Sequence, residues 1–444
     1  MKINPALFSF LTLFMVHLST GPTTRVSAQE FSIPERITGT EVRYRMSRCA
    51  NNQMAFDSEE TLHITYWSGG LSTLPSSPSH IYHRSWRFGE GWSAQTPIDD
   101  STAESSHLGG RHPSLTVDTR DTVWVTWHDH RNSTSAGNWI DNLEIYADSK
   151  PRGGSFSAND LRITNTNAAH LGDNGYTPKM VALADGRVSI AWYDFGLDGD
   201  IADLFLKTSD PAGLFDLGET LTEMRITNKD DRGGNGSYSV PDLAVDQDGH
   251  HHLCWISGLG AAADLFYAEA IEGGTTVTEV PLKASAADFF DPPHITVSDQ
   301  GDVWIAYGDE ELQGIGNEDV VLFRRRAGQS SFDPAIPLLN DPAREYAPDI
   351  EIDSRGLVHL VWVDERAGTN IYYALLEPEN LTLLTEVNLT QTDGNWARPS
   401  LILDNRDQVY ILWEEQIGLN SGAIWFATNA TEKASGVASW DLYE

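Results

Sequence analysis

The densest group of chemically reactive side chains lies between positions 111 and 131. Arg111 and His112 stand together, and His128, Asp129 and His130 follow a short apolar run. Alternate residues of an extended strand share a face, so His128 and His130 are expected to point one way and Asp129 the other. A histidine pair beside an arginine could perform general acid–base chemistry on a sugar. The same residues could instead form a hydrogen-bond cluster that orders a loop, or be incidental polar residues, and the sequence leaves these alternatives open.

Arginines and acids recur in comparable places along the chain. Arginines stand shortly before several apolar segments, at Arg45, Arg48, Arg111, Arg232, Arg344 and Arg398. Acids follow the partner segments, at Asp129, Asp194, Asp309, Asp364, Glu365, Glu414 and Glu415. Converging guanidinium groups could bind a carboxylate or sulfate in a bidentate manner, or they could pair with these acids and organise loops. The substrate-binding candidates that we single out are Arg111, Arg344, Arg398, Asp129, Asp194, Asp364 and Trp396.

These positions are set by an internal repeat of the form Pro-x-Leu-x-Val-Asp-x-x-Gly-x-Val-x-Ile-x-Trp. Six copies separate the proline from the aromatic residue by 14 positions: Pro113 to Trp127, Pro178 to Trp192, Pro241 to Trp255, Pro293 to Tyr307, Pro348 to Trp362 and Pro399 to Trp413. A seventh, weaker copy runs from Gln53 to Trp67. A constant core with spacers of variable length indicates one structural unit that is copied, with insertions confined to loops.

Each unit predicts four antiparallel strands. Alternation at period two around an Asp/Gly turn predicts a hairpin, as in 243–249, and a third and a fourth strand follow it. Seven such units predict an all-β fold, a seven-bladed β-propeller of four-stranded blades. Arg36-Ile37-Thr38 has the form of a fourth strand but has no first three strands before it. We therefore expect the N-terminal strand to close the ring within the last blade.

The N-terminus predicts export. Lys2, the apolar stretch from Ala6 to Leu18 and the exit Val26-Ser27-Ala28 together have the form of a signal peptide covering residues 1–28, cleaved after about Ala28. Residues 29–444 are then expected to form a single propeller domain with units beginning near 53, 113, 178, 241, 293, 348 and 399. No later run approaches the ~20 apolar residues that a membrane helix requires, so we expect no membrane insertion.

The two ends of such a ring differ. The tight hairpin turns, of which 246–249 is one, define the turn face. The connections between second and third strands and between blades lie at the other end and vary in length, as in 128–142, 193–203 and 308–319. We call this end the variable face. Function on a rigid scaffold is expected where loops vary.

The charge and composition of the chain limit the classes of partner that it can bind. The chain has 30 basic and 64 acidic residues, a net charge of −34, which argues against nucleic acid as a partner. The run from Asp198 to Asp203 could bind calcium through oxygen ligands, but its spacing matches no calcium loop. The run from His250 to His252 splits its side chains between two faces of a strand. We expect no metal and no cofactor, and a monomer that binds a glycan or polysaccharide.

The repeat resembles the BNR-repeat, sialidase-like superfamily of secreted propellers. Members carry a Ser-x-Asp-x-Gly-x-Thr-Trp box between third and fourth strands, and this chain has degenerate versions at 89–93, 153–157, 208–215 and 330–333. Sialidases also have arginines near first strands, a place that Arg111, Arg344 or Arg398 could take. The tyrosine, glutamate and aspartate that sialidases require have no clear counterparts in this sequence.

The chain is also similar to propeller polysaccharide lyases of the ulvan type. His130 follows Pro113 as a site histidine does in those enzymes, and Tyr176-Thr177-Pro178 is similar to their Tyr-Pro motif. Gly110 stands where a second histidine is expected, and Tyr193 where an arginine is expected.

Glycan recognition on the variable face by a binding module is the leading interpretation. Aromatic side chains would then stack on sugar rings, the candidates being Tyr176, Tyr238, Tyr346 and Trp396. The alternatives are a carbohydrate-active enzyme, either an exo-sialidase-like glycoside hydrolase or a uronate polysaccharide lyase, and a protein–protein scaffold. For an enzyme, the expected catalytic residues are His112, His130, Tyr176 and Tyr193, assisted by Arg111.

Overall fold

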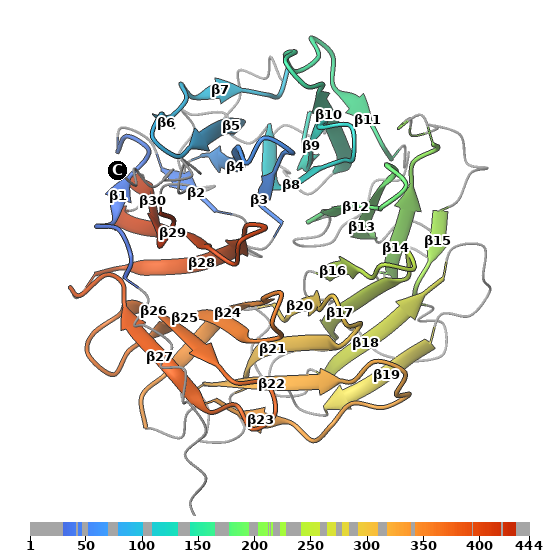
Figure 1. Cartoon of the computed structure of the whole chain (residues 1–444). Coiled ribbons are helices and arrows are strands. Elements are labelled where there is room, and N and C mark those ends of the chain that lie inside the picture. The colour runs from blue at the N-terminus through green and yellow to red at the C-terminus, as the bar shows by residue number, and fades with distance from the viewer. Residues whose placement is uncertain are drawn as a thin grey trace, which may run out of the picture.

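The computed structural model shows a ring of seven β-sheets around a central axis (Figure 1). It describes residues 30–40, 43–46, 52–69, 79–100, 109–131, 143–164, 177–194, 203–211, 213, 215, 223–227, 241–257, 264–271, 278–283, 292–309, 318–338, 342–392, 394–418 and 421–431. Within these ranges the secondary structure is all β, with no helix long and apolar enough to cross a membrane. The predicted seven-bladed propeller is confirmed. The predicted signal peptide lies outside the described residues.

Blades 2 to 6 each use four consecutive strands, which follow one another from the axis outward. Blade 2 comprises β8 (Gly110–Val117), β9 (Val123–Asp129), β10 (Glu144–Lys150) and β11 (Leu161–Arg162). Blade 3 comprises β12 (Lys179–Ala182), β13 (Val188–Asp194), β14 (Asp203–Thr208) and β15 (Glu223–Arg225). Blade 4 comprises β16 (Asp242–Val245), β17 (His251–Ser257), β18 (Asp264–Ala270) and β19 (Thr278–Lys283). Blade 5 comprises β20 (His294–Val297), β21 (Val303–Asp309), β22 (Asp319–Arg325) and β23 (Ile336–Pro337). Blade 6 comprises β24 (Glu345–Ile352), β25 (Val358–Asp364), β26 (Asn370–Leu376) and β27 (Leu383–Asn388).

Blades 1 and 7 meet where the chain closes on itself. Blade 1 has a divided inner strand and a divided outer strand, and comprises β2 (Tyr44–Arg45), β3 (Met54–Phe56), β4 (Leu62–Ser68), β5 (His80–Arg87), β6 (Gly91–Trp92) and β7 (Thr96–Pro97). Blade 7 comprises β28 (Trp396–Leu403), β29 (Val409–Gly418), β30 (Ser421–Thr428) and, on its outer edge, β1 (Glu35–Arg36). The Ile37 amide donates to the Ile424 carbonyl at 2.9 Å, and the Ile424 amide donates to Thr38 Oγ1 at 3.0 Å. The predicted closure by the N-terminal strand is confirmed.

Aromatic residues fill the spaces between the blades. The aromatic residue that ends each repeat is buried in all seven blades: Trp67, Trp127, Trp192, Trp255, Tyr307, Trp362 and Trp413. Seven hydrophobic clusters result among the described residues, and each joins two neighbouring blades. The repeat therefore encodes the interface between blades as well as the blade itself.

The inner strands are joined by buried polar side chains. The residue that follows each repeat proline is at most 3% exposed, and we call this set the axial belt: Ser114, Lys179, Asp242, His294, Asp349 and Ser400. Three belt residues accept a backbone N–H from the next blade, at 2.8 to 3.0 Å: Met180 to Ser114, Ile295 to Asp242 and Leu401 to Asp349. Lys179 lies 3.8 Å from Asp242, and His294 lies 3.4 Å from Asp349.

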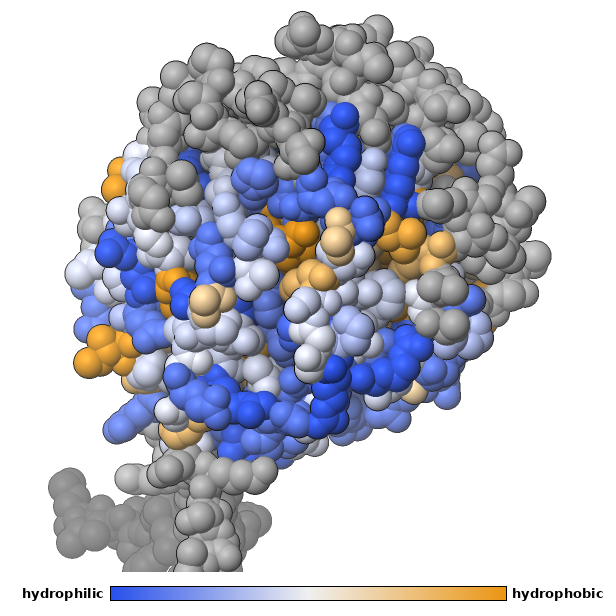
Figure 2. Space-filling model, turned by 90° about the horizontal axis from the view of Figure 1, so that it is seen from above, coloured by the Kyte–Doolittle hydropathy of each residue, from blue (hydrophilic) through white to orange (hydrophobic). Residues whose placement is uncertain are grey.

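The degenerate boxes supply a further contact between blades. Their aromatic residues pack against the preceding blade with ring centroids 5.0 to 6.1 Å apart, in the pairs Trp92–Phe426, Phe156–His83, Phe215–Trp124 and Phe332–Tyr267. On the flank that Figure 2 shows, the coloured surface is largely polar and apolar residues occur in small, separate groups.

Closure of the ring can be tested by truncating a side chain of the N-terminal segment. Ile37 is 6% exposed and packs in the cluster between blades 7 and 1, whereas Ile33 is 91% exposed. Ile37→Ala should lower the free energy of unfolding by about 2–4 kcal/mol, and Ile33→Ala by less than about 0.5 kcal/mol. Equal effects in chemical denaturation would show that this segment does not hold the ring closed.

Candidate binding site on the variable face

The inner strands of blades 2, 6 and 7 carry a bulge just before the repeat proline. Their pairing with the second strand shifts register at this point, and the residue before the proline has φ near +50° in each case: His112, Ala347 and Arg398. This left-handed conformation is costly for a residue other than glycine, by roughly 1 kcal/mol, so packing around the bulge must compensate for it. The bulge redirects the first residues of each of these strands, which lie at the variable face.

The bulge shows that the candidate arginines are not equivalent. Arg111 pairs with His128 across blade 2, and Ala397 pairs with Glu414 across blade 7. His112 therefore corresponds to Arg398. In blade 7 the two corresponding side chains form an ion pair, with Arg398 Nη1 donating to Glu414 at 2.7 Å. In blade 2 the His112 and His128 rings take those places, with centroids 5.2 Å apart.

The variable-face ends of blades 1 and 2 form a continuous group that we call the Arg111 cluster: Arg45, Trp67, Arg111, His112, His128 and His130. The guanidinium carbons of Arg45 and Arg111 lie 5.2 and 5.7 Å from the centre of the Trp67 ring. The His112 ring is 5.5 Å from Trp67, which adds a third contact to the same indole. The structure thus brings together the predicted residues Arg111, His112 and His130.

Arg111 differs electrostatically from the other arginines of this face. Its Nε donates to Ser79 Oγ at 3.2 Å, and within the described part of the chain no carboxylate forms an ion pair with it. Burial lowers the pKa of the Arg111 guanidinium. A half-buried cation that lacks a carboxylate partner gains from an anion delivered by a ligand.

The other candidate arginines are engaged by acids. Arg398 shares the fully buried Glu414 with Arg43 and Arg45, which lie 3.7 Å from it. Arg344 lies 3.1 Å from Glu318 and 3.8 Å from Glu365, and its guanidinium covers the Tyr346 ring at 4.0 Å. For Arg344 and Arg398 the structure therefore favours the interpretation in which the arginines pair with neighbouring acids and organise loops.

Two candidate acids support the fold. Asp129 and Asp364 are fully buried and accept hydrogen bonds from the indole nitrogens of Trp127 and Trp362 at 3.2 and 3.0 Å. Tyr307 donates to Asp309 in the same way, at 3.0 Å. These carboxylates hold the aromatic residues of the repeat and are not exposed to a polysaccharide. For Asp194 the structure describes only the backbone, within β13.

The remaining candidates are mostly buried. Tyr193 is 2% exposed, within the cluster between blades 3 and 4. His130 is 3% exposed. Trp396 is 8% exposed, donates to the Thr392 carbonyl and lies edge-on to Trp425, so its ring is not an open stacking platform. His112 is half-buried, and Tyr176 lies outside the described residues.

Sequence reasoning missed the role of Trp67. Every repeat has an aromatic residue at this position, so burial in the core was the only signal that the pattern carried. Trp67 is indeed 3% exposed, yet its ring also contacts the guanidinium groups of Arg45 and Arg111. No spacing in the sequence predicts this contact, because it depends on the inner strand of blade 1 being divided into β2 and β3.

A proton-binding carboxylate pair lies beside the cluster. Arg131 contacts Asp100, Asp129 and Asp160, the last two at 2.7 Å. Burial, followed by the neighbouring Asp100 carboxylate, raises the pKa of Asp160 to about 8. Within the described ranges, no three His, Cys, Asp or Glu side chains are grouped so as to hold a metal ion.

Comparison with known proteins identifies the architecture. No family model and no curated protein matches the sequence. An ulvan lyase of family PL25 aligns with a TM-score of 0.60 and 10% identity, covering 88% of this chain and 94% of its own. A second structure of that name is bound to a GlcA(1-4)Rha3S unit. Polysaccharide lyase Uly1 aligns with a TM-score of 0.59 and 9% identity, covering 90% and 99% of the two chains.

Sialidases are also among the structural neighbours. The Hadza microbial sialidase Hz136 aligns with a TM-score of 0.47 and 14% identity, over 72% of this chain and 63% of its own. At 9–10% identity the similarity to the lyases shows a shared fold alone.

The space around Gly110 offers a test of the departure from the lyase pattern. A Cβ atom at Gly110 would lie 2.6 Å from Ile81 Cγ1 and from Trp127 Cδ1, whereas one at Gly308 would meet nothing closer than 3.7 Å. Gly110→Ala should therefore cost about 1–3 kcal/mol of unfolding free energy, and Gly308→Ala much less. A well-folded Gly110→His variant with unchanged thermal stability would contradict this packing.

Asp160 predicts a pH-dependent stability. Its pKa is raised in the folded state, so folding favours the protonated form. This contribution is complete below the usual pKa of an aspartate and is lost as the pH rises through 8. Between pH 6 and 9 the wild type should lose stability relative to Asp160→Asn, as measured by thermal unfolding. Asp100→Asn should move this loss to lower pH, because Asp100 supplies part of the rise. Parallel curves would contradict the assignment.

Proposed function

We propose that the variable face binds an acidic polysaccharide, and that Arg111 receives a carboxylate or sulfate of the sugar. The observation that carries this proposal is the half-buried Arg111 guanidinium, which contacts Trp67 and Ser79 and forms no ion pair with a carboxylate of the described residues. Arginine binds planar or tetrahedral oxyanions with directional, charge-assisted hydrogen bonds. The half-buried His112 lies beside the same indole and can donate a hydrogen bond to the ligand.

The structural neighbours support the class of ligand. The two lyases with TM-scores near 0.60 act on polysaccharides according to their names, and one is bound to a unit that combines a uronic acid with a sulfated sugar. An anionic ligand must approach a chain of net charge −34, so the local field of Arg111 has to overcome a general repulsion. Binding should for this reason be strongest to anions that reach the inner strands of blades 1 and 2.

Binding without catalysis is the form that the geometry favours. Tyr193 and His130 are at most 3% exposed, and Gly110 has no room for a histidine. These positions do not present an acid–base pair to a polysaccharide. The hydrolase, lyase and protein–protein scaffold interpretations stay predictions.

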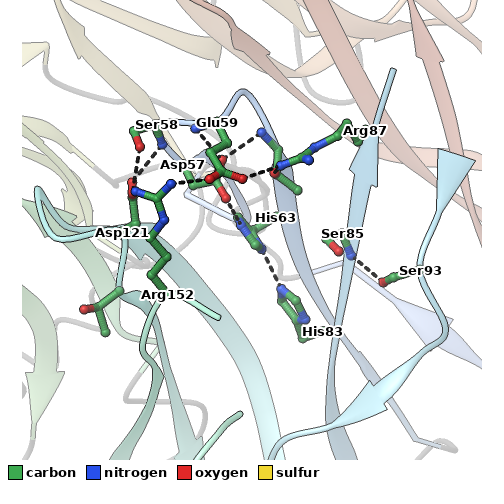
Figure 3. Close-up of polar contacts among 12 residues, drawn as sticks. Asp57, Ser58, Glu59, His63, His83, Ser85, Arg87, Ser93, Asp121 and Arg152 are labelled. Carbon is green, nitrogen blue, oxygen red and sulfur yellow. Dashed lines mark hydrogen bonds and ion pairs between the residues drawn. The ribbon is translucent and has the colours of Figure 1, made fainter. Parts of the chain in front are cut away.

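Affinity for oligoglucuronate tests the proposal. Arg111→Ala should weaken binding by about 10- to 100-fold, the range expected for loss of a charge-assisted hydrogen bond from arginine. The matched control is Arg152→Ala on the turn face, where Arg152 bridges Glu59 and Asp121 and is 56% exposed (Figure 3). Its removal should leave affinity unchanged.

Analysis of the sugars after incubation of the protein with oligoglucuronate tests whether the protein cleaves this ligand. Absence of binding to oligoglucuronate and its sulfated counterparts, or equal losses in both variants, would overturn the proposal. Release of unsaturated or free acidic sugars would show that the protein is an enzyme and not a binding module. Loss of that release in His130→Ala would then identify the histidine as necessary for turnover.

A further inference from the structure

The turn face carries an Asp–His contact that recurs in three blades. The aspartate of the hairpin turn lies 3.2 to 3.5 Å from a histidine six residues later, in the pairs Asp57–His63, Asp246–His252 and Asp353–His359. Figure 3 shows the contact in blade 1, where His63 continues to His83 at 3.0 Å. Each aspartate also accepts backbone amides of its own turn. The contact is therefore a structural feature of the hairpin.

In blade 6 this contact is sealed from solvent. His359 is fully buried and lies 2.9 Å from the Tyr373 hydroxyl. Its cross-strand partner is the buried Leu375, and Phe31 packs edge-on against Tyr373 at 4.9 Å. The contacts of this pair, with the Tyr373 hydroxyl on His359 and the Arg355 guanidinium on Asp353 at 2.6 Å, are explained by stabilisation of the turn.

In blade 4 the same contact opens onto a cavity of about 1040 Å³ between blades 4 and 5. Two polar residues distinguish this blade from blade 6. Glu269 is the cross-strand partner of His252, where blade 6 has Leu375, and His250 stands where blade 6 has Leu357. Their side chains are 25% and 31% exposed and line the cavity.

The added residues form a polar floor. His250 Nδ1 lies 3.4 Å from both Asp246 and Glu269. Arg325 of blade 5 donates to Glu269 at 2.7 Å and covers the Tyr267 ring at 5.1 Å. Burial alone would raise the pKa of Glu269, but the hydrogen bond and charge of Arg325 outweigh it, and the pKa is lowered. Glu269 is thus ionised at neutral pH.

The walls combine aromatic and hydroxyl groups with an excess of negative charge. Phe332 and Pro281 contribute apolar surface, and uncharged polar residues contribute to the rest of the lining: Gln300, Gln329, Ser330 and Ser331. Four carboxylates, Asp246, Asp248, Glu269 and Asp333, face two guanidiniums, Arg325 and Arg326, so the lining carries a net charge of −2 with the histidines neutral. Both guanidiniums are already held by carboxylates. Among the described residues of the lining, each guanidinium is thus paired, and none is left for an anionic ligand.

We propose that this cavity binds a sugar residue with a free ammonium group. Glu269 and the exposed Asp248 receive the ammonium, Phe332 contacts the apolar face of the ring, and the serine and glutamine side chains bind its hydroxyls. Polar groups beside an aromatic wall can fix the orientation of a ligand, and the carboxylate excess selects a cationic one. The site is independent of the Arg111 cluster because it lies on the opposite face and takes the opposite charge.

Calorimetric titration of the full chain with a glucosamine trimer tests the proposal. The N-acetylglucosamine trimer, which has the same ring but no ammonium, should bind at least about tenfold more weakly. Glu269→Gln should weaken binding of the glucosamine trimer by about tenfold or more. Glu379→Gln should leave this affinity unchanged. Glu379 is an exposed carboxylate that pairs with Arg326 but is not itself part of the cavity lining.

Asp248→Asn provides a second variant whose folding is not in question, since its carboxylate is exposed, and it should lose affinity several-fold. Arg111→Ala should bind the glucosamine trimer normally, so failure of this site and failure of the acidic-polysaccharide site are distinguishable. Absence of binding, equal affinity for the acetylated trimer, or equal losses in Glu269→Gln and Glu379→Gln would overturn the proposal.

Discussion

The buried hydrogen bonds of the axial belt are the constraint on which the rest of the structure depends. Apolar clusters between blades are not directional and tolerate small rotations of one sheet against the next. A hydrogen bond from a particular backbone N–H of the next blade to a carboxylate restricts such rotations. Asp242 and Asp349 accept such bonds on the inner strands of blades 4 and 6. Burial raises the pKa of Asp242 despite the nearby Lys179, which shows how costly the position is for a charge. The hydrogen bond that Asp242 accepts from the Ile295 amide sets the angle between blades 4 and 5.

The same register determines what the variable face can present. Because the inner strands are fixed at the belt, the bulge one residue before the proline turns equivalent positions of blades 2, 6 and 7 toward the same end of the ring. In blade 7 these positions hold the Arg398–Glu414 ion pair, whereas blade 2 has histidines there and leaves Arg111 without such a partner among the described residues. One scaffold thus yields a closed ion pair in one blade and an anion-seeking group in another.

The repeat predicted the blades, their number and the closing strand, because burial of Trp127 and its equivalents keeps a constant distance from the proline to the aromatic residue within each copy. The site was harder to predict. The repeat spacing aligns Arg398 with His112, but it does not show that Arg398 pairs with Glu414, or that the Tyr193 ring is buried between blades. The prediction that the side chains of residues 250–252 lie on two faces of the strand is confirmed. His251 bonds Ser189 of blade 3, whereas His250 and His252 contact Asp246. Glu269 and Arg325, which lie beside these histidines, come from the strands β18 and β22. A local sequence pattern does not predict that they meet there.

The distribution of charge gives the two faces different ligand preferences. A chain with 34 more acids than bases repels polyanions, but at physiological salt that repulsion is screened beyond about 8 Å. At shorter range the local arrangement of charged partners decides which ligand is attracted. At Arg111 the local excess is positive because no described carboxylate pairs with it, and between blades 4 and 5 it is negative because the described lining has four carboxylates and two guanidiniums. The two proposed sites therefore differ in the charge that they select, an acid on the variable face and an amine on the turn face.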